Sequence, residues 1–192
     1  MKRIIIGITG ATGILYGIRI LELLKKNPAV ETHLILSKPA VQTLAYETDM
    51  NLQAIKGLAD QVHSNEDIAA SVSSGSFQTE AMIIAPCSMR TLSAIAHGHS
   101  DKLIARAADV ILKERRRLIL MVRETPLHYG HLQNMLLVTQ MGAIVAPPVP
   151  AFYHRPQSID DIVDHTVGRI LDLIHIEHNL VARWKDPLAS SQ

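Results

Sequence analysis

The sequence predicts one three-layer α/β domain, in which a mostly parallel sheet carries helices on both faces. Apolar β-branched segments of strand length alternate with segments of helical periodicity along the chain. Aromatic residues make up only 4%, so the core must be built from Ile, Leu, Val, Ala and Met, the usual material of a buried parallel sheet. The length of 192 residues suits one domain with one core.

The expected elements follow this alternation. The strands are expected at residues 3–8, 32–36, 81–85, 118–122 and 143–146, with a short strand at 61–63 inside an irregular stretch, 49–77. The helices are expected at 14–26, 38–46, from about 88, from 101 or 102 to 114 and at 128–141, and a last long helix is capped by Ser158. Ligands of such sheets bind beyond the carboxyl ends of the strands, so residues that directly follow strands are the informative ones.

Composition excludes several classes of protein. The formal net charge of +1 gives no general attraction to nucleic acid or to an acidic membrane, and no apolar run reaches transmembrane length. The single cysteine, Cys87, rules out an internal disulfide and a cysteine-based metal cluster. Residues 1–3 and the apolar run after them resemble a signal peptide, but Arg19 and Glu22 interrupt the run. We therefore expect a buried first strand in a soluble, cytoplasmic protein.

The first strand leads into a glycine loop, Gly10-Ala11-Thr12-Gly13, and then into a helix. Glycine permits a tight turn and a close approach of the backbone to a ligand. The helix N-terminus offers free N–H groups and a positive dipole end to a phosphate, and Thr9 and Thr12 can add hydroxyl donors. Dinucleotide and mononucleotide sites share this pattern, and a plain tight turn is the structural alternative.

The end of the second strand argues against a nicotinamide dinucleotide. Such a site expects an acidic residue there to hold the ribose, whereas Ser37 and Lys38 follow this strand and suit an anion better. The chain also lacks the lysine of a GxxxxGK phosphate loop at this position. These observations favour a mononucleotide.

The later strand ends carry further polar residues. Ser88 and Thr91 can cap a helix, bind a cofactor, or do both. Cys87 has no His or acid beside it in sequence and is interpreted as a small buried thiol. Arg123 and Glu124 directly follow a buried strand, where charges are costly unless a ligand uses them or they pair with each other.

Other basic and histidine residues have simpler interpretations. Residues 115–117 are all arginine at a helix C-terminus, where positive charge is favourable, and are expected to be solvated. Tyr153 can stack on or hydrogen-bond a ligand, and His154 can act as a base. The close histidine pairs 97/99, 128/131 and 175/178 have no third ligand at a recognised metal spacing, which favours surface or capping roles.

Taken in order, these segments resemble the flavin prenyltransferases, the UbiX/Pad family, formerly labelled aromatic or phenylacrylic acid decarboxylases. The resemblance runs from Ile4 to Trp184. Its motifs are TGATGxxYG at 9–17, SK at 37–38, ETD at 47–49, the Ser/Gly cluster at 71–76, PCSMRTL at 86–92, RAADVxLKERR at 106–116, RETP at 123–126, HLxNM at 131–135 and FYHRPQS at 152–158.

The resemblance implies a Rossmann-like or flavodoxin-like flavoprotein domain over residues 1–192, with a C-terminal tail from about 185. Members of the family bind reduced FMN and are metal-independent prenyltransferases. They join the dimethylallyl group of dimethylallyl phosphate to N5 and C6 of the flavin and release phosphate. The product, prenylated FMN, serves a UbiD-type decarboxylase. Members assemble as dodecamers with sites between subunits.

The resemblance also implies the site residues. Those expected to bind the flavin are Gly10, Ala11, Thr12, Ser37, Ser88, Met89, Arg90, Thr91 and Arg123. Those expected around the prenyl phosphate are Ser74, Arg106, Lys113, Arg123, Tyr153 and Arg169. The implied catalytic residues are Glu124, which would assist phosphate departure, Glu47, near the reacting flavin, and Lys113. The chemistry agrees, because cationic donors stabilise a leaving phosphate and an acid can protonate it.

Three other functions fit the sequence less well. A peptidyl-cysteine type of FMN-dependent decarboxylase needs a His early in the first helix and an Asn-bearing turn, whereas residues 13–24 contain no His and Pro86-Cys87-Ser88 replaces that turn. Direct decarboxylation of aromatic acids needs a second substrate pocket that no motif supplies. A non-catalytic FMN carrier gives Glu124 and Lys113 no role. The pathway, the partner decarboxylase, the mono- or diphosphate donor and the subunit that supplies each residue stay open.

Overall fold

The computed structural model describes residues 1–181, which form two compact units. The first unit covers residues 1–148 and the second begins at Val149. The expected tail from about residue 185, and Trp184 at the end of the resemblance, lie outside the described residues. Each unit is described by itself.

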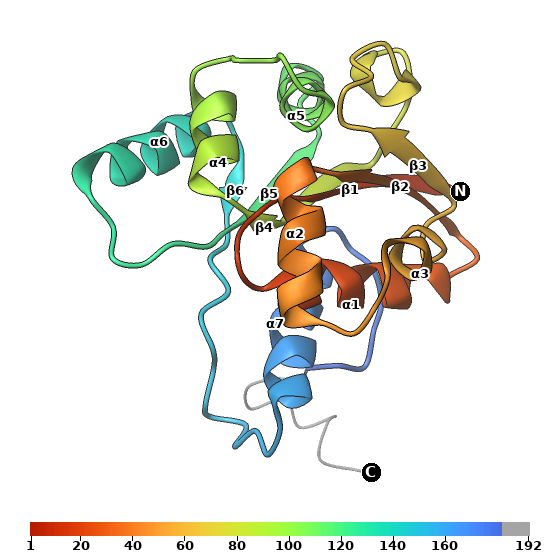
Figure 1. The fold of residues 1–192 in the computed structure, drawn as a ribbon, viewed down its shortest axis with the longest axis vertical. Helices are drawn as coiled ribbons and strands as arrows, with labels where there is room; N and C mark the ends of the chain where they lie inside the picture. Colours follow the sequence, from red (N-terminus) through yellow and green to blue (C-terminus); the bar gives the residue numbers. More distant parts are fainter. Residues whose placement is uncertain (182–192) are drawn as a thin grey trace. The chain divides into compact units, whose positions relative to one another are not determined.

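A six-stranded sheet organises the first unit, in the order β3-β2-β1-β4-β5-β6 (Figure 1). Its strands are β1 (Lys2–Ile8), β2 (Val30–Leu36), β3 (Gln61–Ser64), β4 (Ala81–Cys87), β5 (Arg117–Val122) and β6 (Ile144–Val145). Every neighbouring pair is parallel. The winding reverses between β1 and β4, and such a switch point opens a crevice at the carboxyl ends of the strands. The predicted α/β fold class is confirmed.

Helices cover both faces of this sheet. They are α1 (Ile14–Lys25), α2 (Lys38–Glu47), α3 (Leu52–Lys56), α4 (Met89–Ala96), α5 (Leu103–Lys113) and α6 (Tyr129–Gln140), with a 3-10 turn at Ser71–Ser73. Figure 1 shows α1 and α5 on opposite faces of the sheet. Two covered faces explain why the central strand β4 is apolar along its whole length, with every residue buried.

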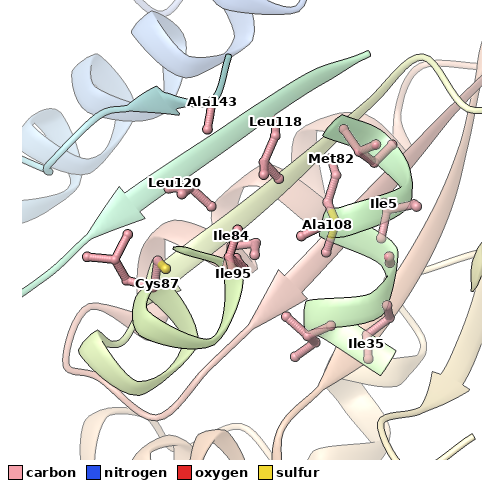
Figure 2. Close-up of a cluster of buried hydrophobic side chains, with 14 of the residues drawn as sticks. Ile5, Ile35, Met82, Ile84, Cys87, Ile95, Ala108, Leu118, Leu120 and Ala143 are labelled. Carbon is pink, nitrogen blue, oxygen red and sulfur yellow. The ribbon is translucent and has the colours of Figure 1, made fainter. Parts of the chain in front are cut away.

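The core between the sheet and helices α4 and α5 is shown in Figure 2. It is formed by alternate side chains of the strands together with residues of both helices, among them Ile5, Met82, Ile84, Ile95, Ala108, Leu118 and Leu120. Cys87 belongs to this cluster and is fully buried. Burial raises the pKa of its thiol to about 12. The prediction of a small buried thiol is confirmed.

The second unit contains α7 (Ile159–Leu173). Its first turn is capped as predicted, because the Ser158 hydroxyl accepts the Asp161 N–H at 3.1 Å. The Asp161 carboxylate in turn accepts the N–H groups of Gln157 and Ser158 at 2.7 and 3.0 Å. These hydrogen bonds lower the pKa of Asp161, and the bond from Gln157 has the largest effect. This reciprocal arrangement fixes the start of the helix.

The structure corrects the expected elements in three places. Helix α3 lies within the stretch expected to be irregular, and the Asn51 side chain caps it by accepting the Ala54 N–H at 2.8 Å. Strand β4 continues through Pro86, whose carbonyl still accepts the Thr9 hydroxyl at 2.7 Å. Strand β6 has only two residues. Across residues 1–181, no helix is long and apolar enough to span a membrane.

Candidate active site

A cavity of about 440 Å³ opens at the carboxyl ends of β1, β2 and β4. Its volume is in the range of small-molecule and cofactor sites. The predicted flavin residues in its wall are Gly10, Ser37, Ser88, Arg90 and Thr91. Of the other predicted flavin residues, Ala11 and Thr12 follow Gly10 in the glycine loop, and Met89 is the first residue of α4 and packs against the core. The switch point of the sheet therefore brings five of the predicted flavin residues together around one cavity.

Thr9 joins the two strands that meet at this switch point. Its hydroxyl donates to the Pro86 carbonyl at 2.7 Å and accepts the Ser88 N–H at 2.8 Å. The side chain is 1% exposed. Thr9 lines the cavity, but its hydroxyl is used within the chain. Thr9 therefore holds Ser88 in position through these two hydrogen bonds. The sequence predicted instead that its hydroxyl donates to a bound phosphate.

The glycine loop packs tightly against the start of α2. A Cβ built on Gly10 would lie 2.3 Å from the Cβ of Pro39, so no other residue fits there without moving α2. Gly13, at the N-terminus of α1, has a φ of 95°, a left-handed conformation that favours glycine. The sequence predicted that glycine lets the backbone approach a ligand closely. At Gly10 the backbone approaches Pro39 of the chain itself.

The N-terminus of α1 is occupied by the carboxylate of Glu47. This carboxylate accepts the N–H of Gly13 at 2.9 Å and that of Ile14 at 3.0 Å. The expectation that α1 offers free N–H groups to a phosphate is thus wrong for these two groups. The physical reason is that a helix N-terminus favours an anion, and the last residue of α2 supplies one.

Two other helices begin at the cavity instead. Ser37 caps α2 by accepting the Ala40 N–H at 3.2 Å, and Ser88 caps α4 by accepting the Thr91 N–H at 3.4 Å. Both serines line the cavity together with Lys38 and Arg90. Ser88 and Thr91 therefore act as cap and as cavity wall at once. Two helix N-termini, hydroxyls and two cations make this wall suited to an anion.

Another part of the cavity wall comes from residues that the sequence did not single out. The Asn65 side chain accepts the Ile104 N–H at 3.0 Å, and its carbonyl accepts the Leu103 N–H at 2.9 Å. Glu66 forms an ion pair with Lys102 beside it. These contacts fix the loop after β3 to the start of α5. No local motif marks this loop, because its partners lie almost forty residues away in sequence.

Arg123 and Glu124 lie at the same edge of the sheet, directly after β5. The Arg123 N–H donates to the Cys87 carbonyl at 3.1 Å, which places it beside the turn that carries Ser88. Both residues are exposed. The Glu124 carboxylate accepts the Thr125 N–H at 3.0 Å. Within residues 1–181 the two side chains do not form the mutual ion pair that was the structural alternative, so both charges face solvent.

Lys113 and Ser74 lie at the other end of α5. The helix starts at the cavity with Ile104 and Ala105, and the rise from Ala105 to Lys113 is about 12 Å. Lys113 is paired with Glu114, and this contact lowers the pKa of Glu114.

Ser74 is next to that pair. A Cβ on Gly75 would lie 2.6 Å from the Lys113 ammonium, so the loop that carries Ser74 lies against Lys113. Arg106 occupies the same helix and is paired with Asp109 at 2.7 Å. One chain therefore brings Ser74 to Lys113 but keeps both away from the cavity.

Arg116 departs from the solvated role expected for residues 115–117. Its guanidinium donates to the carbonyls of Gly75 and Phe77 at 2.7 and 2.9 Å and to the Thr79 hydroxyl at 3.1 Å. Its side chain is 16% exposed. Because these donors hold the loop after Ser74 against α5, Arg116 fixes the position of Ser74 and Lys113.

Tyr153 and Arg169 belong to the second unit. The Tyr153 hydroxyl lies 2.8 Å from Nε2 of His165, and Arg169 donates to Asp172 at 2.6 Å. His154, considered as a base, stacks on His165 with ring centroids 4.3 Å apart. The structure thus joins Tyr153, His154 and His165 in one cluster.

Comparison with known proteins identifies the family. The Flavoprotein family model matches residues 1–171. Flavin prenyltransferase UbiX of Escherichia coli strain K12 is 56% identical over 187 residues, which cover 96% of this chain and 99% of that protein. Flavin prenyltransferase UbiX of Thauera aromatica is 53% identical over 182 residues, 95% of this chain and 93% of that protein. The chain belongs to the UbiX family of flavin prenyltransferases.

Solved structures of UbiX proteins share its fold closely. The dodecameric FMN-dependent UbiX-like decarboxylase from Escherichia coli O157:H7 superposes with a TM-score of 0.94 at 48% identity, covering 96% of this chain and 100% of that one. AnUbiX (PadA1), in complex with FMN and dimethylallyl pyrophosphate, gives 0.94 at 52% identity, with coverage of 96% and 98%. The peptidyl-cysteine decarboxylase EpiD, at 15% identity and a TM-score of 0.64, shares the fold alone.

The histidine pairs of this UbiX-family chain have structural partners. His128 caps α6 by accepting the Gly130 N–H at 3.1 Å and stacks on His131. His178 pairs with Asp172 at 3.1 Å. In the part of the chain that the structure describes, no three His, Cys, Asp or Glu side chains gather into a metal-binding group.

Proposed function

We propose that this protein is a flavin prenyltransferase, which joins the dimethylallyl group of dimethylallyl phosphate to N5 and C6 of reduced FMN. The observation that carries the proposal is the cavity at the switch point, whose wall contains Gly10, Ser37, Ser88, Arg90 and Thr91. A relative 52% identical to this chain was solved with FMN and dimethylallyl pyrophosphate.

The cavity suits FMN at both ends of that molecule. Hydroxyls, helix N-termini and the cations Lys38 and Arg90 suit a phosphate. Apolar surface from Pro39, Ile104 and Ala105 suits a flat ring system. Ala11, Thr12, Met89 and Arg123, which follow cavity residues or neighbouring strand ends in the chain, complete the proposed flavin contacts. Reduced FMN, which is cofactor and substrate at once, supplies the electron-rich ring in this proposal.

The proposed reaction balances without a metal or an oxidant. The allylic C–O bond of the donor breaks, and its electron pair leaves with the phosphate. New bonds form at N5 and at C6, each in place of a hydrogen. One of the two released protons is taken up by the prenyl double bond, and the other leaves on the phosphate. The product is prenylated FMN, which would pass to a UbiD-type decarboxylase.

The residues of the chain supply binding and proton transfer. Glu124, exposed beside the Ser88 turn, is proposed to protonate the departing phosphate. Charged and polar donors are proposed to stabilise that phosphate: Arg106, Lys113, Arg123, Tyr153, Arg169 and Ser74. Glu47 is proposed to act near the reacting flavin, and its bonds to Gly13 and Ile14 hold the glycine loop in place.

The proposed site needs more than one copy of the chain. Lys113 lies about 12 Å along α5 from Ala105 in the cavity wall. Because the loop of Ser74 lies against Lys113, a neighbouring copy is proposed to supply both residues. The outer face of α6 (Tyr129, Leu132 and Leu136), more than half exposed at each residue, offers apolar surface for such a contact. A related UbiX-like protein is dodecameric, and we propose the same assembly here.

We also propose a cytoplasmic location. It is supported by a single buried cysteine and the lack of any cysteine pair for a disulfide.

The test is an incubation without oxygen of the purified protein with FMN, a reductant and dimethylallyl phosphate. The expected result is a flavin heavier by one isoprene unit, formed only when the flavin is reduced. The matched variant Glu124→Gln should bind FMN as before and form that product at least about a hundredfold more slowly, the usual range for loss of a general acid. An unchanged flavin mass with FMN shown to be bound contradicts the proposal. Release of CO2 from an aromatic acid by this protein alone would favour the decarboxylase alternative.

A further inference from the structure

Tyr153, proposed above as a ligand of the prenyl phosphate, is joined to a buried histidine. Its hydroxyl lies 2.8 Å from Nε2 of His165. His165 is only 6% exposed, whereas Tyr153 is 49% exposed. The phenol is therefore joined to the interior of the second unit, while about half of the surface of Tyr153 is exposed.

Packing fixes the ring of His165. The His154 ring stacks on it with an interplanar angle of 4°, and the Tyr153 ring meets it edge-on at a centroid distance of 5.4 Å. Burial, and then the charges of His154 and Arg169, lower the pKa of His165. The imidazole is therefore neutral near pH 7 and carries a single N–H.

His165 and Arg169 are four residues apart on α7, which puts them on the same side of the helix. The Arg169 guanidinium is itself held by Asp172, whose other carboxylate oxygen lies 3.1 Å from Nε2 of His178. The two groups proposed to bind the donor phosphate are thus each held by another residue of the second unit. His165 holds the Tyr153 phenol, and Asp172 holds the Arg169 guanidinium.

We infer that His165 is a positioning residue of the prenyl-donor site, which donates its Nε2–H to the phenol oxygen of Tyr153 and so directs the phenol hydrogen at the donor phosphate. The inference rests on the proposed function. The reason is one of valence: a phenol has one hydrogen, so a Tyr153 that donates to phosphate can only accept from His165. A donor bonded to the phenol oxygen also polarises its O–H and strengthens the bond to the phosphate.

The test separates this hydrogen bond from simple packing. His165→Phe keeps a ring beside His154 but removes the N–H, whereas His165→Gln retains a donor near the position of Nε2. Dimethylallyl phosphate is titrated by calorimetry into protein loaded with oxidised FMN, which allows binding without turnover. His165→Phe and Tyr153→Phe should each raise the donor Kd roughly tenfold, the usual effect of one hydrogen bond to a charged ligand. His165→Gln should restore most of the affinity.

Controls make the result specific. The double variant should bind the donor no more weakly than Tyr153→Phe alone, because both changes remove the same bond. The Kd for FMN should not change, and Tyr46→Phe, which alters a phenol that is 89% exposed, should behave as wild type. Wild-type affinity in His165→Phe, no rescue by His165→Gln, or full additivity in the double variant would overturn the inference.

The outcomes also separate the inference from the proposed function. If the wild-type protein binds the donor in this His165-dependent manner but forms no prenylated flavin once FMN is reduced, the proposed function fails and the positioning role stands. If the wild-type protein does not bind dimethylallyl phosphate, the positioning role fails as well.

Discussion

At the scale of single residues, Glu47 links a predicted catalytic group to the structure around it. Its carboxylate accepts two backbone N–H groups at the start of α1, and Gly13 there adopts a left-handed conformation. A carboxylate at this position is favoured both as a hydrogen-bond acceptor and by the helix dipole. The residue thus has a stabilising role that is separate from the chemistry proposed for it.

This stabilising role can be measured. Glu47→Ala should lower the free energy of unfolding by about 1 kcal/mol, since it leaves the N–H groups of Gly13 and Ile14 without their acceptor. Glu47→Gln should cost less, because an amide oxygen can still accept, while it should still impair prenylation. Urea unfolding measures the first effect and flavin mass the second. Glu80→Gln, at an exposed residue, is the control, and equal stability of Glu47→Ala and wild type would rule out the cap.

At the scale of elements, Arg116 fastens the loop after the 3-10 turn to the end of α5. Three donated hydrogen bonds join it to residues 75–79. We expect Arg116→Ala to lower the free energy of unfolding by about 1–3 kcal/mol, because it leaves two carbonyls and a hydroxyl without this donor. Amide hydrogen exchange in residues 74–79 should become faster.

The matched control for Arg116 is Arg115→Asn. Arg115 is exposed and has a φ of 57°, which asparagine accepts more easily than most residues. This variant should keep wild-type stability and exchange. Equal effects of the two variants would mean that the hydrogen bonds of Arg116 do not hold the loop.

The edge of the sheet at β2 and β3 carries a pH-sensitive contact. Nδ1 of His33 lies 2.9 Å from Nε2 of His63, with stacked rings, and Nε2 of His33 faces Glu31 at 3.3 Å. Burial is the main reason that the pKa of each imidazole is lowered. Nδ1 of His33 and Nε2 of His63 share one hydrogen in this contact. The contact is lost when both nitrogens carry a hydrogen.

Stability should therefore fall in acid. A lowered folded-state pKa means that the unfolded chain takes up protons first, so this contribution is complete above about pH 6.5 and is lost as the pH falls below it. Urea midpoints between pH 8 and pH 5 test this. His63→Phe, which keeps a ring but cannot titrate, should flatten the fall, and the exposed His99→Gln should not. If the urea midpoint of His63→Phe falls as steeply as that of wild type, or more steeply, the two histidines do not cause the loss of stability in acid.

Local signals explain what the sequence could predict. The alternation of strands and helices, and the caps Ser88 and Ser158, depend on residues a few positions apart. The contacts that the sequence missed join distant residues: Glu47 to Gly13, and Arg116 to Gly75. Nothing in the local pattern distinguishes Arg116 from Arg115. Asn51 is the exception among the missed contacts, because it caps α3 by accepting the N–H of Ala54, only three residues away. An asparagine at this position is a local pattern that predicts a helix start.

At the scale of the whole molecule, the outer face of α6 bears on assembly. Tyr129, Leu132 and Leu136 are 74, 52 and 57% exposed, a costly apolar surface for an isolated chain. Leu136→Lys should shift the protein to smaller assemblies in mass photometry. It should also reduce prenylation, because the proposed site needs more than one copy of the chain. Gln53→Lys, at an exposed position of α3, should leave assembly unchanged. An unaltered oligomer in Leu136→Lys would mean that this face is not an interface.

The central claim is that flavin prenylation takes place in sites shared between copies of the chain. Lys113 lies at the far end of α5 from the cavity, whereas Glu124 follows β5 at the cavity's edge of the sheet. The most direct measurement is the mass of the flavin produced by assemblies that contain both Lys113→Ala and Glu124→Gln chains. Each variant alone should leave FMN almost unmodified, and the mixed assembly should form prenylated FMN because some of its sites combine an intact Lys113 with an intact Glu124. A mixed assembly as inactive as its parents, beside an active wild type, would contradict the account.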